Sequence, residues 1–191
     1  MISNNTSNTF RVVVLGAVSS GKTSIIRRLL FDSFSSDTSP TLGAVLSTYM
    51  TTINGKIVKM NIWDTAGQEY YKSISKFYYR DANAAIIVFD VGSLVSFQDI
   101  DYWLNELEES VSGKLLIIVV GNKIDLFETR EVEKTVGMAY STGVEVEYME
   151  TSAKTGEGIA ELFQEIAKHF ALLNDKKQET QETQKKEHCC S

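Results

Sequence analysis

The sequence has few cysteines, and both stand at its very end. Cys189 and Cys190 are the only two in 191 residues, so a disulfide within the folded body is excluded. An excess of positive charge is also lacking, because 19 Lys and Arg face 25 Asp and Glu and the net charge is −6. Nonspecific binding to nucleic acid requires clustered basic residues, so we expect no nucleic-acid partner.

Long apolar runs are missing as well. No run reaches the ~18 apolar residues that a membrane-spanning helix needs, and MISNNTSNTF at the start lacks the basic and apolar regions of a secretory signal. We therefore expect a cytosolic chain that does not span a membrane. Polar composition predicts flexible ends at residues 1–9 and 174–191 around one folded domain, residues 10–173.

Within this domain, short apolar runs alternate with amphipathic segments. Residues 11–15, 84–89 and 115–120 are nearly unbroken aliphatic runs, as in strands buried on both faces of a parallel sheet. Alternating residues on both sides of Asn54-Gly55 predict an antiparallel hairpin with a type I′ turn. Helices are expected at residues 21–31, 68–80, 94–111, 130–142 and 157–172. This order predicts an α/β fold, with a doubly wound mixed six-stranded sheet, five flanking helices and ligand-binding loops at the carboxyl ends of the strands.

The first apolar run leads directly into residues 16–24, GAVSSGKTS, which match the pattern GxxxxGK[ST] of a P-loop NTPase. In this phosphate loop, backbone N–H groups and the dipole of the following helix form a cradle for phosphate oxygens. Lys22 would neutralise phosphate charge, and the Thr23 hydroxyl would complete a Mg²⁺ shell. The strand-loop-helix context disfavours the alternative, a chance glycine-rich turn. The expected nucleotide contacts are Val18, Ser19, Ser20, Gly21, Lys22, Thr23 and Ser24.

Two further loops favour guanine over adenine. The NKID loop (residues 122–125) follows a buried strand, and the Asp125 carboxylate can accept hydrogen bonds from guanine N1–H and its 2-amino group, which adenine does not offer. Asn122 would connect this loop to the phosphate loop, and the stem of Lys123 would cover the base. By itself the tetrapeptide also fits a solvated turn. The SAK loop (Ser152, Ala153 and Lys154) adds a second element, because the Ala153 N–H can reach guanine O6.

Together these motifs resemble the Ras-like small GTPases, and among them the Rab family. The resemblance extends over about residues 10–170 and follows the family order. Its motifs are GAVSSGKT (16–23), PTLG (40–43), WDTAGQE (63–69), YYR (78–80), NKID (122–125), ETSAKTG (150–156) and the terminal CCS. The TLGA segment is most similar to the endosomal Rab branch. The resemblance implies a GTP/GDP switch in vesicular traffic that hydrolyses GTP, uses Mg²⁺ and has a monomeric G domain. It also implies effectors, an exchange factor, a GTPase-activating protein and a GDP-dissociation inhibitor as partners.

The resemblance also implies roles for single residues. Thr41 would bind Mg²⁺ and report the γ-phosphate, and Asp64 would hold the metal through water. Gly67 would donate its N–H to the γ-phosphate, and Gln68 would be the catalytic residue that orients the attacking water. Phe34 would lie against the guanine. The alternatives are an ordinary loop hydroxyl for Thr41, a solvated turn for residues 64–68 and a core position for Phe34.

Val18 departs from the family pattern, which has Gly or a small residue such as Ser at this position. A branched side chain there would crowd Gln68 and any arginine finger, so we expect slow hydrolysis. The alternative is a GTP-bound scaffold or pseudo-GTPase that keeps binding but little catalysis. An ATP-using P-loop kinase is opposed by the NKID and SAK loops and by the lack of an evident lid domain.

Two surfaces bear on partners. Leu46, Trp63 and Tyr78 occupy positions of the aromatic patch that Rab effectors read, although Trp63 and Tyr78 fit the core equally well. The ending Cys189-Cys190-Ser191 resembles the paired-cysteine ends that receive two geranylgeranyl groups. Two lipid chains anchor a protein stably where one does not. We therefore expect lipidation of both cysteines and a location on the cytoplasmic face of vesicle or endosomal membranes, with cycling through the cytosol.

Overall fold

The computed structural model describes residues 9–37, 39–41, 43–66 and 78–188, with side chains described as far as residue 175. A six-stranded sheet has the order β2-β3-β1-β4-β5-β6. Its strands are β1 (Thr9–Gly16), β2 (Ala44–Ile53), β3 (Lys56–Thr65), β4 (Ala84–Asp90), β5 (Leu116–Asn122) and β6 (Glu147–Thr151). β2 is antiparallel to β3, whereas the other neighbouring pairs are parallel. The predicted α/β fold with a mixed six-stranded sheet is confirmed.

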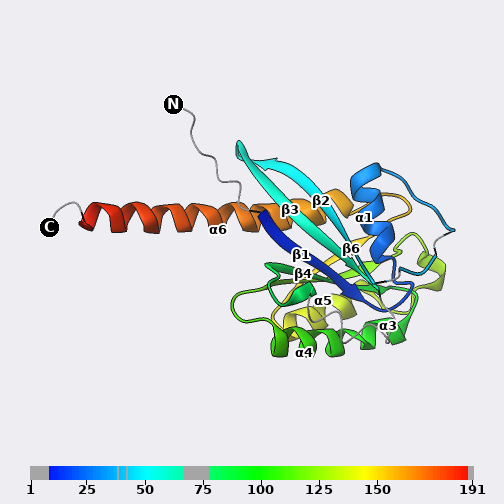
Figure 1. Cartoon of the computed structure of the whole chain (residues 1–191). Coiled ribbons are helices and arrows are strands. Elements are labelled where there is room, and N and C mark those ends of the chain that lie inside the picture. The colour runs from blue at the N-terminus through cyan, green and yellow to red at the C-terminus, as the bar shows by residue number, and fades with distance from the viewer. Residues whose placement is uncertain (1–8, 38, 42, 67–77, 189–191) are drawn as a thin grey trace.

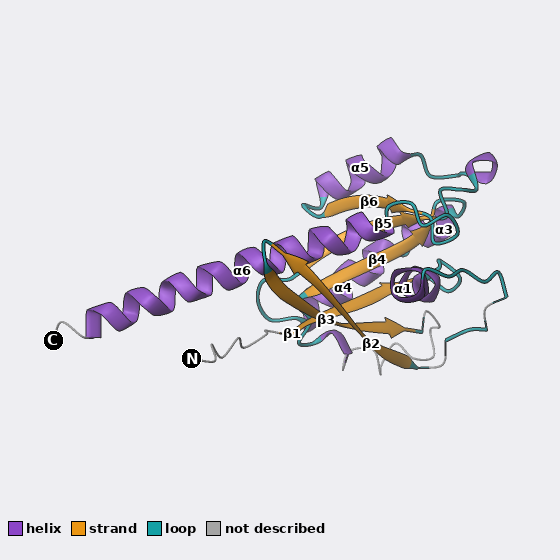
Figure 2. Cartoon of the chain, turned by 90° about the horizontal axis from the view of Figure 1, so that it is seen from above, coloured by secondary structure: helices purple, strands orange, loops and turns teal. Residues whose placement is uncertain are grey.

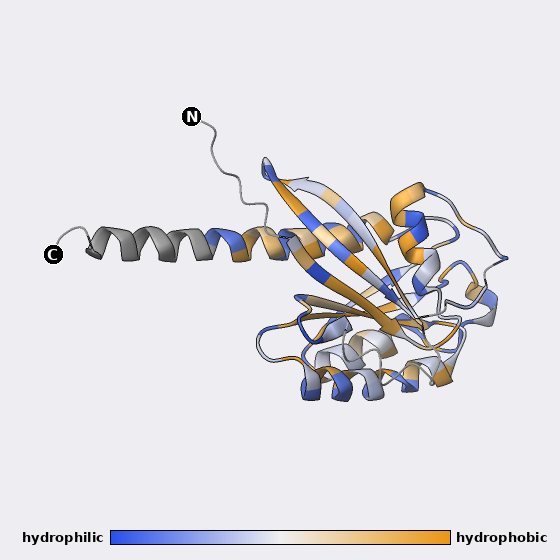
Figure 3. Ribbon diagram, in the orientation of Figure 1, coloured by the Kyte–Doolittle hydropathy of each residue, from blue (hydrophilic) through white to orange (hydrophobic). Residues whose placement is uncertain are grey.

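Helices cover both faces of this sheet (Figure 1). The described α-helices are α1 (Lys22–Phe31), α3 (Leu94–Gln98), α4 (Ile100–Ser110), α5 (Lys134–Gly143) and α6 (Ile159–His188). α1 and α6 pack on one face, where the Phe10 and Phe170 rings stack at 4.1 Å. α3, α4 and α5 pack on the other face, where Trp103 and Leu107 are buried against Phe89. Apolar residues follow the central strands in Figure 3, because these strands are covered on both sides.

The hairpin between β2 and β3 has the turn that its sequence predicts. Asn54 and Gly55 have φ values of 50° and 76°, and Ile53 pairs with Lys56 across the turn. Positive φ at both central residues defines a type I′ turn, which matches the twist of the strands.

Two helices differ from their predicted ranges. The range 94–111 contains two helices that meet at Asp99, where the backbone keeps helical φ and ψ of −67° and −11°. Apolar periodicity therefore continues across the break and conceals it. The range 130–142 begins its helix only at Lys134, because Glu131 and Val132 donate their N–H groups to the Val91 carbonyl. Most of the range 68–80 lies outside the described residues.

The last helix is longer than predicted. The apolar spacing ends near residue 172, but α6 continues to His188 and extends away from the sheet (Figures 1 and 2). Residues 174–188 are rich in Gln, Glu and Lys and contain no Gly or Pro, so their helix propensity continues where the apolar pattern stops. The flexibility of this tail and the domain boundary at residue 173 stay predictions. Among the described residues, no helix has the length and hydropathy that a membrane crossing requires.

Candidate nucleotide site

Loops from distant parts of the chain meet at the carboxyl ends of β1, β3, β5 and β6 and enclose a cavity of about 450 Å³. Most predicted contact residues line it. These are Val18, Ser19, Gly21, Lys22, Thr23, Ser24, Phe34, Thr41, Asn122, Lys123, Asp125, Ala153 and Lys154. Ser20, Asp64 and Ser152 are buried beside this lining. The remaining lining residues were not among the predicted contacts, although two of them belong to the motifs PTLG and WDTAGQE; they are Ser35, Ser36, Ser39, Pro40, Thr65 and Leu126. The predicted residues Gly67 and Gln68 lie outside the described residues, as do Cys189 and Cys190.

The phosphate loop needs glycine at two positions because other chain segments approach its backbone. Gly16 has φ 128°, and a Cβ there would stand 2.0 Å from the Val88 carbonyl oxygen. Gly21 has φ 97°, and a Cβ there would stand 2.2 Å from the Asn122 amide nitrogen. Only glycine combines this conformation with this closeness. The loop therefore curls tightly between β4 and the NKID loop, with its backbone turned toward the cavity.

Lys22 lies inside the curl of the phosphate loop. Its Nζ donates hydrogen bonds to the carbonyls of Gly16 and Ala17, at 2.8 and 2.7 Å. Burial lowers the pKa of Lys22 to about 8, although the nearby Asp64 carboxylate opposes this change. A buried ammonium gains more from an added anion than an exposed one does, because water screens it less. The arrangement suits a phosphate group at this end of the cavity.

Three oxygen-bearing side chains gather beside Lys22. The Thr23 hydroxyl donates to Asp64 Oδ2 at 2.6 Å and lies 2.8 Å from the Thr41 hydroxyl. Asp64 Oδ1 is buried with no hydrogen-bond partner among the described residues, and burial raises the pKa of this carboxyl. Hydroxyl and carboxylate oxygens are the ligands that Mg²⁺ takes together with water and substrate phosphates. The unpartnered oxygen and this donor set fit a magnesium ion.

Asn122 joins the loops around the cavity by its side chain. Its Nδ2 donates to the Ser20 carbonyl at 2.8 Å, which connects the NKID loop to the phosphate loop. Its Oδ1 accepts from the Thr151 hydroxyl at 3.1 Å and from the Ala153 N–H at 3.3 Å. Since one buried amide contacts all these segments, their relative positions depend on it.

The Asp125 carboxylate is held by the SAK loop. Its Oδ1 accepts from the buried Ser152 hydroxyl at 2.6 Å, and its Oδ2 lies 3.7 Å from Lys154 Nζ. The carboxylate thus has a fixed orientation at the cavity wall while retaining accepting capacity. The geometry suits recognition of a ligand edge that carries two neighbouring N–H donors.

Arg28, on α1, is a residue that motif reading missed. Its Nε and Nη2 donate to the carbonyls of Ala153 and Lys154, at 2.9 and 2.7 Å, and its Nη1 donates to the Asp32 carbonyl at 3.0 Å. The guanidinium therefore fastens the SAK loop to the helix that follows the phosphate loop. No local signal could identify this role, because Ala153 and Lys154 are over a hundred residues away along the chain.

Trp63 and Tyr78 contact each other, and Leu46 lies beside them. The ring centroids of Trp63 and Tyr78 are 5.0 Å apart, with an angle of 38° between the ring planes. Leu46 pairs with Trp63 in the register of β2 and β3. Trp63 is partly buried against the core, with the Arg11 guanidinium 5.5 Å from its ring centroid, whereas Leu46 is exposed. The two rings are thus half-buried and adjoin an exposed apolar residue, and a role of this surface in effector binding stays a prediction.

Comparisons with known proteins agree on one protein family. A Ras family model matches residues 11–172. Human "Ras-related protein Rab-30" is 39% identical over 171 residues, covering 90% of this chain and 83% of that protein. Baker's yeast "GTP-binding protein YPT53" is 42% identical over 164 residues, covering 83% and 74%. "Ras-related protein Rab-5A" of Dictyostelium discoideum is 40% identical over 168 residues, covering 88% and 84%.

Proposed function

Because this chain belongs to the Ras family and is a Rab GTPase that hydrolyses GTP, we propose that it binds GTP with Mg²⁺ in the cavity described above and recruits effectors in endosomal traffic. The observation that carries the proposal is the single cavity that joins the phosphate loop, the Thr23–Asp64 pair and the two base-reading loops. A phosphate site and a base site at opposite ends of one cavity suit a nucleotide.

The proposed contacts follow from the chemistry of each group. Lys22 and the phosphate-loop N–H groups would bind the phosphates, and the Asp125 carboxylate would accept from the guanine edge. Thr23, Thr41 and Asp64 would hold Mg²⁺, which neutralises phosphate charge when bound. The Ala153 N–H already contacts Asn122 at 3.3 Å, so a bond to guanine O6 would share this donor.

For hydrolysis, we propose that Gln68 orients the attacking water and that Gly67 contacts the γ-phosphate. Val18, which lines the cavity and is exposed, supports a slow rate because it would stand where water and Gln68 must meet. The alternative of a GTP-bound scaffold or pseudo-GTPase that keeps little catalysis is not favoured, since the chain belongs to the Ras family and its Rab relatives are GTPases.

For location, the proposal places the protein on the cytoplasmic face of vesicle or endosomal membranes, held by geranylgeranyl groups on Cys189 and Cys190. The similarity of the TLGA segment to the endosomal Rab branch supports the compartment. The exposed Leu46 beside the Trp63–Tyr78 pair supports an effector surface on the β2–β3 hairpin. Exchange factors, activating proteins and a GDP-dissociation inhibitor would complete the cycle.

The test is a comparison of nucleotide affinities. Fluorescent GDP, ADP and xanthosine diphosphate are titrated against nucleotide-free protein and against Asp125→Asn. We expect wild-type protein to prefer GDP over ADP by about 10⁴-fold, because adenine leaves the carboxylate unpaired. The amide of Asp125→Asn can donate to xanthine O2, so this variant should prefer xanthosine diphosphate.

The matched control is Asp81→Asn, the same chemical change at an exposed carboxylate 3.9 Å from Arg11 and outside the cavity lining. It should keep the preference for GDP. Equal affinity of the wild-type protein for GDP and ADP would contradict the proposed site.

A further inference from the structure

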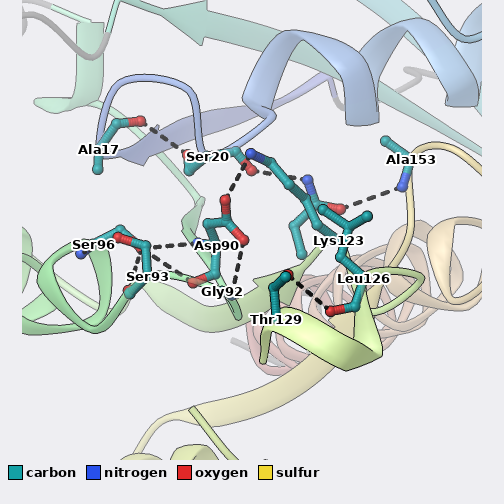
Figure 4. Close-up of polar contacts among 11 residues, drawn as sticks. Ala17, Ser20, Asp90, Gly92, Ser93, Ser96, Lys123, Leu126, Thr129 and Ala153 are labelled. Carbon is teal, nitrogen blue, oxygen red and sulfur yellow. Dashed lines mark hydrogen bonds and ion pairs between the residues drawn. The ribbon is translucent and has the colours of Figure 1, made fainter. Parts of the chain in front are cut away.

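Lys123 has a close carboxylate partner that no motif includes. Its Nζ lies 2.7 Å from Asp90 Oδ2 (Figure 4). Asp90 is the last residue of β4 and pairs with Asn122 of β5 in the sheet register. The carboxylate therefore lies beside Asn122, where the NKID loop begins. The side chains are 31% and 20% exposed, so water screens this pair less than it would screen a fully exposed one.

The Asp90 carboxylate is itself held in place. Its Oδ1 accepts the Gly92 N–H at 2.9 Å, and its backbone N–H donates to the Ser96 hydroxyl at 3.0 Å. That buried hydroxyl also lies 2.8 Å from the Ser93 carbonyl, and Ser93 caps α3 by accepting the Ser96 N–H (Figure 4). The Gly92 N–H thus holds the carboxylate that Lys123 meets, and Ser96 of α3 holds the backbone of Asp90.

Lys123 has an unusual backbone conformation and a side chain that faces the cavity. Its backbone has φ 68°, a left-handed conformation that residues other than glycine seldom adopt. Its side chain lines the cavity, and a lysine stem with a free end samples many rotamers. With Nζ held at Asp90, the stem is restricted to the cavity wall between the NKID loop and β4.

We propose that Asp90 is a positioning residue for nucleotide binding, which acts by holding Lys123 across the base end of the cavity. The inference rests on the proposed function, because it assumes that the Lys123 stem covers the base. Asp90 itself is absent from the cavity lining, so its effect on the nucleotide passes through Lys123.

The test measures how fast bound fluorescent GDP is released in excess EDTA, so that metal does not mask contacts to the base. Asp90→Asn suits the test because the amide Oδ1 can still accept the Gly92 N–H while the charge facing Lys123 is lost. Loss of a charge-assisted hydrogen bond should accelerate release about tenfold. Asp81→Asn serves as the matched control and should leave the release rate unchanged.

A double-mutant cycle with Lys123→Met separates positioning from a structural role. If Asp90 acts through Lys123, then Asp90→Asn adds no further acceleration in the Lys123→Met background. An unchanged GDP release rate in Asp90→Asn would overturn the proposal. It would also be overturned if Asp90→Asn accelerated release equally in the wild-type protein and in Lys123→Met, because such an effect does not pass through Lys123 and indicates a change in the fold. Unchanged release from Lys123→Met would also overturn it, yet the proposed function would stand if the preference for GDP over ADP persisted.

Discussion

Val18 shows how positions within one short loop differ in their constraints. Gly16 and Gly21 cannot carry a side chain, because carbonyl and amide atoms stand within 2.2 Å of where a Cβ would be. Val18 stands between them with 47% of its surface exposed, and it lines the cavity. The fold thus leaves this position open, so we expect its side chain to affect the chemistry in the cavity rather than the packing.

At this position, Val18→Ser and Val18→Gly should both accelerate hydrolysis of bound GTP several-fold. A smaller side chain leaves room for the attacking water and Gln68 near the γ-phosphate. Single-turnover hydrolysis with Mg²⁺ measures the effect, with Val136→Ser as a control of nearly equal exposure, 48%, on α5. Identical rates for the wild-type protein and both variants would mean that the valine does not slow the reaction.

At the scale of elements, the contact between α5 and β6 supports the part of the cavity wall that the SAK loop forms. Gly137 lies in α5 against Tyr148 of β6, and a Cβ at this glycine would stand 2.4 Å from the tyrosine ring. The Tyr148 hydroxyl donates to Glu150, whose carboxylate also pairs with Arg130 at 2.8 Å. Because Glu150 precedes the SAK loop by two residues, close packing of α5 helps to place that loop.

Gly137→Ala should therefore destabilise the GDP-bound protein by about 1–3 kcal/mol, as overpacking does, even though alanine is the better helix former. The control is Gly143→Ala at the end of the same helix, where a Cβ would meet nothing within 4 Å. Urea unfolding followed by circular dichroism compares the two variants. A Gly137→Ala protein as stable as the wild type would show that Tyr148 of β6 moves to accommodate the added methyl group with little loss of stability.

At the scale of the whole molecule, α6 extends away from the sheet as far as His188 (Figure 1). Residues 174–191 contain four lysines and four acidic residues, so attraction to anionic lipid contributes little to membrane binding. The anchoring proposed here depends on the lipid groups alone. The long helix would then act as a spacer between the membrane and the domain.

Geranylgeranylated protein should float with phosphatidylcholine vesicles, whereas Cys189→Ser/Cys190→Ser should stay in the soluble fraction, because two buried lipid chains supply the binding energy. The GDP release rate of this variant should equal that of the wild type, which serves as the control for folding. Tight binding of the unmodified wild-type protein to anionic vesicles would contradict the inference that charge attraction by the tail contributes little to membrane binding.

Local patterns in the sequence predicted much of this molecule. The aliphatic runs predicted the central strands, Asn54-Gly55 the hairpin turn, and Gly16, Gly21 and Lys22 the phosphate loop. Each of these features depends on side-chain period, on backbone freedom or on short motifs, so neighbours along the chain suffice to specify it.

Only the tertiary structure decided the remainder. The late start of α5 depends on hydrogen bonds to Val91, and the contacts of the SAK and NKID loops with Arg28 and Asp90 join segments far apart in the sequence. The sequence by itself determined which elements form and which chemistry their loops carry. The tertiary structure decided which side chains hold those loops, because partners far apart in the sequence become neighbours only when parallel strands bring their carboxyl ends to one edge of the sheet.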